Sequence, residues 1–149
     1  MKNKFICLAM IKYIFKFVFI VLIMGTSCSY HSRSFSNGQM KKIYIKQFKL
    51  TYIRMLLLKG YNYSDAVKEI IGKDNSGFAE PILFEEDYHL IDSFTTIDND
   101  KMKLDSIEGI DRAEGAQGKR PLGYLIDIMK SKFLDSLSKS QYKINKKKI

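Results

Sequence analysis

Apolar side chains recur at steps of three and four residues after residue 40, and this spacing constrains the fold more than any other feature of the sequence. In residues 40–58, this spacing would put five side chains on one face of a helix: Ile45, Phe48, Tyr52, Met55 and Leu56. Gly60 follows this stretch, and glycine accepts the left-handed backbone conformation that often ends a helix. The pattern therefore predicts a long amphipathic helix that ends near Gly60.

Two further helices are predicted from capping residues and prolines. The first covers Asp65–Ile71; Asn62 or Ser64 is expected to cap it, and Gly72 is expected to end it. Its apolar residues are expected to be buried: Ala66, Val67, Ile70 and Ile71. The next is expected to open at Pro81, because proline suits the first helical turn. Its dipole is complemented by the acidic residues Glu85, Glu86 and Asp87, and its expected buried stripe is Phe84, Tyr88, Ile91 and Phe94 or Thr95.

The C-terminal third contains one ambiguous stretch and one clear helical segment. In residues 98–110, polar and apolar residues alternate over KMKLDSI as they do in a β-strand. The spacing of Leu104, Ile107 and Ile110 also fits a helical turn. Pro121 is expected to begin the last long helical segment, and Ser131 is expected to divide this segment into two helices. The residues predicted to face the core are Leu122, Leu125, Ile126, Met129, Phe133 and Leu137. The sequence after residue 40 has the length of one domain, and we predict a small all-α bundle of four to five helices.

The first 28 residues have the pattern of an export signal. Four lysines, at positions 2, 4, 12 and 16, precede the apolar run Phe17–Met24, and the small residues Gly25, Thr26 and Ser27 lead to Cys28. The charge-free run is too short to span a bilayer as a helix. This indicates that residues 1–27 are a cleaved signal rather than a permanent membrane anchor. The position of Cys28 resembles a bacterial lipoprotein signal, in which the first mature residue is lipidated, although GTSC lacks the usual leucine three residues earlier. Simple secretion is the alternative.

Composition divides the rest of the chain into a tether, a domain and a basic tail. Residues 28–39 are serine-rich, which predicts a flexible tether. The helical domain is expected to comprise residues 40–142, and a basic tail residues 143–149. The net charge of +9 comes from 25 Lys+Arg against 16 Asp+Glu; four of the lysines lie in the signal and four in the tail, which leaves 17 against 16. The domain is therefore nearly neutral, and nucleic acid is not a predicted partner. A short lysine tail is usually a solvated end, but such arms also bind anionic lipid.

No residue pattern predicts catalysis, a cofactor or a metal site. The only cysteines are Cys7, which would leave with the signal, and Cys28, so no disulfide is expected within the mature chain. His31 lies in the tether, and His89 follows Glu85 at four residues, an arrangement typical of a helical surface pair. The acidic stretch Glu80–Glu114 lacks the ligand order of a calcium-binding loop. We predict that the protein is not an enzyme; an exported enzyme built on Glu85, Glu86 and Asp87 remains an alternative.

The segment Glu114-Gly-Ala-Gln-Gly-Lys-Arg120 is the strongest candidate for a binding site. Two glycines and a glutamine within five residues do not belong inside a helix, and aliphatic residues flank the segment on both sides. A loop held at both ends by a bundle can present backbone groups, a carboxylate and two cations to a concave partner surface. An ordinary connection between two helices, in which Arg120 caps a neighbouring helix, is the alternative interpretation.

Three stretches of the chain resemble the type VI secretion amidase immunity family, in particular its Bacteroidales-like members. They are GYNYSDAVKEI at Gly60–Ile70, EGAQGKR at Glu114–Arg120 and SKFLDSL at Ser131–Leu137. The resemblance implies a helical, often dimeric, periplasmic inhibitor that plugs the cleft holding the Cys–His pair of a peptidoglycan amidase toxin. By motif match, the plug would be formed by Glu114, Gly115, Gln117, Gly118, Lys119 and Arg120.

In one respect the chain departs from this family. Members commonly carry cysteines in the first helix and just after the glycine loop, where this chain has Arg54 or Met55 and Tyr124. A disulfide brace is therefore absent, and the loop is expected to be less rigid. The expected location is the periplasm, with a membrane tether through a lipidated Cys28. The alternative function is a lipid-tethered helical envelope protein that binds peptidoglycan or another envelope protein and has no toxin partner.

Overall fold

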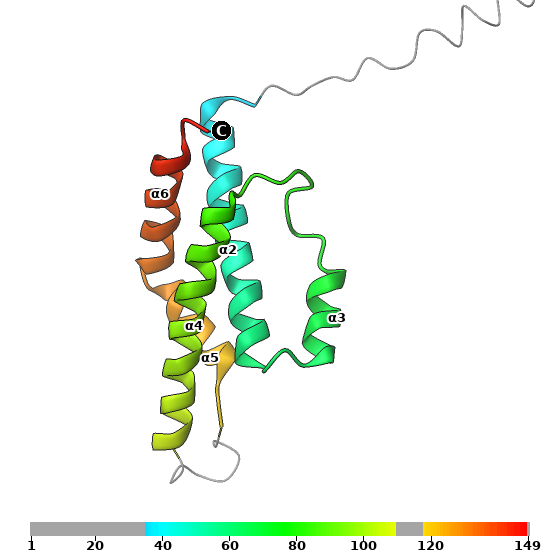
Figure 1. Ribbon diagram of the computed structural model, residues 1–149, viewed down its shortest axis with the longest axis vertical. Coiled ribbons are helices and arrows are strands. Elements are labelled where there is room, and N and C mark those ends of the chain that lie inside the picture. The colour runs from blue at the N-terminus through cyan, green and yellow to red at the C-terminus, as the bar shows by residue number, and fades with distance from the viewer. Residues whose placement is uncertain (1–34, 110–117, 149) are drawn as a thin grey trace, which may run out of the picture. The chain divides into compact units, whose positions relative to one another are not determined.

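The structure, a computed structural model, describes residues 35–109 and 118–148 of the chain (Figure 1). All regular secondary structure in these residues is helical: α2 (Asn37–Gly60), α3 (Asp65–Lys73), α4 (Glu85–Glu108), α5 (Pro121–Lys130) and α6 (Phe133–Asn145). The predicted all-α bundle of four to five helices is confirmed. The predicted export signal, Cys28 and His31 lie outside the described residues. Of the helices named here, none is long and apolar enough to cross a membrane.

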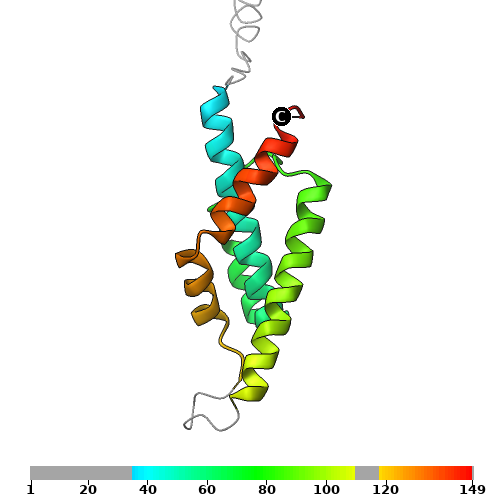
Figure 2. The ribbon, with the colours of Figure 1, turned by 90° about the vertical axis from the view of Figure 1, so that its left-hand side faces the viewer.

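Helix α2 is the centre of the bundle and packs against each of the other four helices (Figures 1 and 2). Four of its side chains at steps of four are fully buried: Tyr44, Phe48, Tyr52 and Leu56. The predictions for Phe48, Tyr52 and Leu56 are confirmed, whereas Ile45 and Met55 pack at the edge of the core. Ser36 and Gln39 form a reciprocal capping box at the start. The helix therefore begins at Asn37, and residues 37–39 belong to it rather than to the predicted tether.

Gly60 lies in the last turn of α2, but the reason for a glycine at this position differs from the predicted one. A Cβ atom at residue 60 would lie 2.8 Å from the Cβ of Pro121, the first residue of α5. The left-handed residues are instead Asn62 and Tyr63, with φ angles of 53° and 56°. Glycine at position 60 thus allows α5 to approach the end of α2 closely, and the turn is made two residues later.

Helix α3 forms where predicted, but it is not buried. It runs through Gly72 to Lys73, and none of its residues is buried; Ile70, predicted to face the core, is 69 % exposed. The helix is joined to α2 by polar contacts of the segment that follows it. Arg54 Nη2 donates to the carboxylate of Asp74 at 2.8 Å, and the backbone N–H of Phe78 donates to Gln47 at 2.9 Å. The inward face of α2 is occupied by α4, α5 and α6, which leaves α3 outside.

Helix α4 begins later than predicted and continues further. Pro81 lies in the connection before it, and the first helical residue is Glu85, so the expected start at Pro81 is wrong. The acidic first turn is confirmed, and the carboxylate of Asp87 accepts from the backbone N–H of Phe84 at 2.9 Å, which satisfies an N-terminal donor. Ile91 and Thr95 are fully buried, whereas Tyr88 is exposed. The ambiguous stretch is helical to Glu108.

Helices α5 and α6 lie one after the other along α2, with α4 on another side (Figure 2). Pro121 at the start of α5 and the break at Ser131 are confirmed. On α5 the predicted inward position of Leu125 is confirmed, since it is partly buried against the core. The predictions for Leu122, Ile126 and Met129 are wrong, because all three are more than half exposed. The buried residues are instead Pro121 and Ile128 on α5 and, on α6, Leu134, Ser138, Tyr142 and Asn145. Helix α5 is apolar on most sides, so its rotation is set by the partners of Pro121 and Tyr124 rather than by its own pattern.

The predicted basic tail is partly integrated into the bundle. Helix α6 extends to Asn145, whose amide donates to the carboxylate of Asp87 at 2.9 Å and to the hydroxyl of Tyr44 at 3.2 Å. Lys148 forms an ion pair with Glu86 at 3.0 Å. Residues 35–149 form a compact unit of their own. Among the described residues of this unit, every buried side-chain nitrogen and oxygen has a hydrogen-bond partner.

Candidate functional site

The candidate loop connects α4 to α5 in the sequence, and its described end, residues 118–120, leads into α5 (Figure 1). Lys119 in this part contacts Lys59 at the C-terminal end of α2. Glu114, Gly115 and Gln117 lie outside the described residues, whereas Gly118, Lys119 and Arg120 are described. Gly118 has a φ of 92°, a conformation that residues with a Cβ rarely adopt. The chain therefore turns at Gly118 and then enters α5 through Lys119, Arg120 and Pro121. We call residues 118–121 the loop root.

Lys119 is bound to the bundle. Its ammonium group donates to the side-chain oxygen of Asn62 at 2.6 Å, to that of Asn99 at 3.2 Å and to the carbonyl oxygen of Lys59 at 3.2 Å. An ammonium group has three hydrogens, so three acceptors satisfy it fully. Burial, with a smaller effect from the nearby charge of Lys103, lowers the pKa of Lys119 below its ordinary value. Lys119 thus holds the end of α2, the following turn and α4 together, a role that the sequence prediction did not include.

Arg120 is held more weakly than Lys119 and is accessible to solvent. Its guanidinium group contacts the carboxylate of Asp105 on α4 at 2.9 Å. The two side chains are 56 % and 41 % exposed, and an ion pair at such exposure contributes at most about 1 kcal/mol to stability. The guanidinium can therefore exchange Asp105 for a carboxylate of another molecule at little cost.

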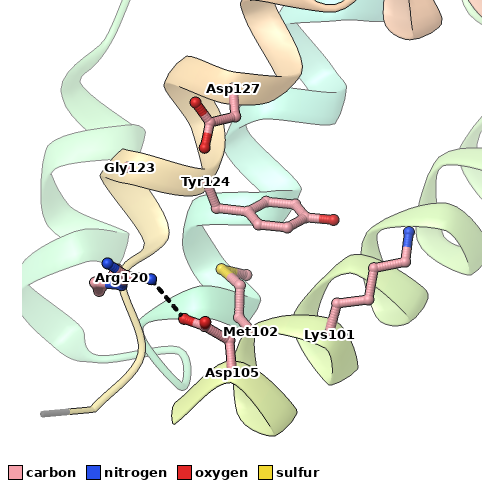
Figure 3. A pocket seen from close by; sticks show the side chains of 7 residues that line it. All are labelled: Lys101, Met102, Asp105, Arg120, Gly123, Tyr124 and Asp127. Atoms are coloured by element: carbon pink, nitrogen blue, oxygen red, sulfur yellow. Dashed lines mark hydrogen bonds and ion pairs between the residues drawn. The ribbon is translucent and has the colours of Figure 1, made fainter. Parts of the chain in front are cut away.

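A pocket of about 340 Å³ lies beside the loop root, between α4 and α5 (Figure 3). It is lined by Lys101, Met102, Asp105, Arg120, Gly123, Tyr124 and Asp127. Figure 3 shows the Arg120–Asp105 pair on one side of the pocket and Asp127 on α5 near Tyr124. Within the described residues, the carboxylate of Asp127 has no hydrogen bond or ion pair. The pocket thus offers an apolar floor at Met102 and charged groups of both signs around it.

The carboxylate of Asp98 connects three helices and is contacted by Tyr124 and Lys101, two residues that line this pocket. Tyr52 on α2 donates to one of its oxygens, and Tyr124 on α5 donates to the other at 2.8 Å. Lys101 also contacts it at 3.2 Å, and Asp98 itself is almost fully buried. Burial, together with the hydrogen bond to Asp98, raises the pKa values of Tyr52 and Tyr124 well above the ordinary tyrosine value. Both phenols therefore stay protonated and act as structural donors rather than as catalytic bases.

This cluster was not predicted from the sequence, although the sequence contains one signal for it. Tyr52 was predicted to be buried, and a buried tyrosine hydroxyl usually has a hydrogen-bond partner. The acidic residues of α4 are the nearest source of such a partner. A second cluster of the same kind is formed by Tyr44, Asp87 and Asn145, in which the phenol of Tyr44 donates to Asp87 at 2.7 Å.

The three carboxylates considered for an enzyme do not meet at one site. Asp87 is fully buried against Tyr44 and Asn145, as described above. Glu86 pairs with Lys148 on the surface, and Glu85 lies 3.5 Å from the imidazole of His89. The Glu85–His89 contact matches the helical surface pair that the spacing predicts. Within residues 35–109 and 118–148, no group of three His, Cys, Asp or Glu side chains is arranged to hold a metal ion.

Comparison with known proteins supplies no relative: no protein-family model, curated protein or solved structure matches the chain.

Proposed function

We propose that the protein is an exported immunity protein, tethered to a membrane through Cys28, that binds a peptidoglycan amidase toxin delivered by type VI secretion. In this proposal the loop Glu114–Arg120 enters the active-site cleft of the toxin and blocks it sterically. The proposal takes its partner from the resemblance of three sequence stretches to the amidase immunity family. Its physical support comes from the way in which the loop root is held by the bundle.

The anchoring of the loop root is the observation that carries the proposal. Lys119 binds three oxygen atoms of α2, the following turn and α4. Pro121 packs against Gly60 so closely that no side chain would fit at residue 60. Tyr124, one turn further on, is joined to Asp98. A binding segment that is held in place before it meets its partner loses less conformational entropy on binding, and this raises affinity.

The cluster around Asp98 takes the place of the disulfide that the resemblance leads one to expect. The two relevant neighbourhoods are Arg54–Met55 on α2 and Tyr124 on α5, and neither contains a cysteine. Tyr52, on the same helix as Arg54, shares the carboxylate of Asp98 with Tyr124. The helix after the loop is thus fastened to α2 by hydrogen bonds to a charged group, which are stronger than bonds between neutral groups.

Within the loop, the contacts divide the residues between anchoring and recognition. Lys119 is assigned to anchoring, since its three hydrogen-bond donors are used within the bundle. Arg120 is assigned to recognition, because its guanidinium is more than half exposed and its pair with Asp105 is weak. Gln117 is assigned to recognition from the sequence alone, since an amide can satisfy polar groups in a cleft.

The proposal is tested by calorimetric titration of the chain with the amidase encoded beside its gene. We expect Arg120→Ala to weaken binding roughly thirtyfold or more, as is typical when a buried interfacial arginine is removed. Gln117→Ala is expected to weaken binding in the same direction. Arg120→Ala should leave the melting temperature almost unchanged, because the exposed pair of Arg120 with Asp105 contributes little to stability.

Lys73→Ala is the matched control for loss of a positive charge. Lys73 is exposed and pairs with Glu69 on its own helix, α3, and no described contact joins it to the loop root. Lys119→Met keeps the length of the side chain but removes its hydrogen bonds, and we expect it to lower both stability and affinity. If Arg120→Ala and Gln117→Ala bind and protect as well as the parent, the inhibitory surface is not this loop.

A further inference from the structure

Positive charge is concentrated on two neighbouring helices of the bundle. Helix α2 contains no Asp or Glu, and α6 with the residues after it contains one, Asp135. By contrast, α4 carries the acidic residues Glu85, Glu86, Asp87, Asp92, Asp98, Asp100, Asp105 and Glu108 and only two basic ones, Lys101 and Lys103. The near-neutral charge of the domain therefore conceals a separation of charge between its helices.

The lysines of α2 and α6 form two rows that meet at Asp135. Lys49 of α2 contacts this carboxylate at 2.6 Å, and Lys139 of α6 contacts it from one turn further along α6. Steps of three and four residues lead from Lys49 back to Lys46 and Lys42, and steps of three and four lead from Lys139 on to Lys143 and Lys146. We call this set of six lysines the basic surface.

Most of the basic surface has no acidic partner in the bundle. Lys42, Lys46, Lys143 and Lys146 are exposed, and none of them forms an ion pair or a side-chain hydrogen bond with another described residue. On α3 and α4, by contrast, each lysine has an acidic partner: Lys68 pairs with Asp65, Lys73 with Glu69, Lys101 with Asp98 and Lys103 with Asp100. Outside the basic surface, four further described lysines form no ion pair or side-chain hydrogen bond: Lys41, Lys130, Lys132 and Lys147. The described lysines without such a partner therefore lie on α2, α5 and α6 or beside α6, and not on α3 or α4.

The basic surface belongs to the half of the bundle from which the chain leads back to Cys28. Tyr44 near the start of α2 contacts Tyr142 and Asn145 near the end of α6. The loop root contacts the opposite end of α2, at Lys59, fifteen residues or about 22 Å further along the helix axis. The cap residue Ser36 follows Cys28 by eight residues, which span at most about 28 Å when fully extended.

We propose that the basic surface binds the anionic phospholipid headgroups of a bilayer. Lysines near such a membrane are attracted by its negative surface potential, and one acyl anchor with a basic patch holds a protein more firmly than the anchor alone. Contact through the N-terminal half of α2 leaves the loop root at the other end free for a partner. The choice of a membrane as the occupant rests on the export and lipidation proposed above, but the binding itself requires no toxin.

Vesicle sedimentation of residues 29–149, which contain the whole helical unit and no lipidation site, tests this proposal. We expect binding to mixed phosphatidylcholine–phosphatidylglycerol vesicles, weakening as salt is added, and none to pure phosphatidylcholine vesicles. Replacing three lysines together, Lys42→Gln, Lys46→Gln and Lys143→Gln, should weaken binding by a factor on the order of 100, since each lysine near the surface contributes about fivefold.

The matched control removes three lysines from α3 and α4: Lys68→Gln, Lys73→Gln and Lys103→Gln. Both triple variants lose the same charge, and only the first should lose lipid binding. Equal losses in the two variants, or equal binding to neutral vesicles, would overturn the proposal. Binding of a single-stranded oligonucleotide but not of anionic vesicles would also overturn it, since another polyanion would then be the partner. Toxin binding by the first triple variant should match the parent, so failure here is distinct from failure of the proposed function.

Discussion

Tyr52 and Tyr124 lie 72 positions apart in the sequence, and their phenols donate to the two oxygens of one carboxylate, that of Asp98. This arrangement joins α2, α4 and α5 at a point next to the loop root. It resembles the contact of Tyr44 and Asn145 with Asp87, which joins α2, α4 and α6 in the other half of the bundle. Each of the two C-terminal helices is thus attached to the α2–α4 pair by a hydrogen bond to a buried aspartate.

Removal of one phenol from the Asp98 cluster should destabilise the bundle measurably. We expect Tyr124→Phe to lower the free energy of unfolding by about 1–3 kcal/mol, because a hydrogen bond to a charged acceptor is lost. Tyr88→Phe is the control, since Tyr88 is 45 % exposed and its hydroxyl has no partner among the described residues. Urea denaturation of the two variants checks this, and equal midpoints would show that the Tyr124–Asp98 bond contributes nothing.

The contact of Gly60 with Pro121 predicts opposite effects for the same substitution at two glycines of α2. Gly60→Ala should destabilise the bundle, because the new methyl group would lie 2.8 Å from Pro121. Gly38→Ala meets nothing within 4 Å, and should stabilise by about 0.4–1 kcal/mol through the lower entropy of the unfolded chain. Thermal melting followed by circular dichroism distinguishes the two. A stabilising Gly60→Ala would mean that α5 does not approach α2 as described.

Burial of aromatic side chains predicts a large difference between two phenylalanines. Phe48 is fully buried, and Phe48→Ala should cost about 3–5 kcal/mol of stability. Phe133 is 42 % exposed and makes an edge contact with Phe94 at a ring-centroid distance of 5.4 Å. Phe133→Ala should therefore cost only about 0.5–1.5 kcal/mol, the typical contribution of one aromatic pair. The account of α6 fails if the two substitutions have equal effects in denaturant titration.

The ion pairs of Asp135 predict a loss of stability at low pH. Lys139, followed by Lys49, lowers the pKa of Asp135 from its ordinary value of 3.8 to about 2. A lowered folded-state pKa stabilises the fold above the unfolded-state pKa, and this contribution is lost as the pH falls from about 4 to about 2. The difference in melting temperature between the parent and Asp135→Asn should therefore shrink over this range. A difference that stays constant from neutral pH to pH 2 contradicts the assigned ion pairs.

Local signals in the sequence predicted where helices occur better than they predicted which helical residues are buried. Pro121 and Ser131 mark real boundaries, because capping and proline geometry act within one turn. The burial of Ile70 and Met129 was predicted wrongly, because an apolar stripe shows that a helix can pack but not whether another helix covers it. The contacts of Lys119 with Asn62 and Asn99 connect residues distant in sequence, and no local pattern reports them. The anchoring role of Lys119 therefore became visible only in the fold.

The proposed function requires the loop Glu114–Arg120 to enter the active-site cleft of the amidase, and chemical cross-linking from within the loop detects such a contact. We would introduce one thiol by Gln117→Cys into residues 29–149, which contain no other cysteine, and mix this chain with the toxin under mild oxidation. The account predicts a disulfide with the catalytic cysteine of the toxin, found by mass spectrometry and absent when Ser140→Cys is used instead. A disulfide from position 140 and none from position 117 would contradict it.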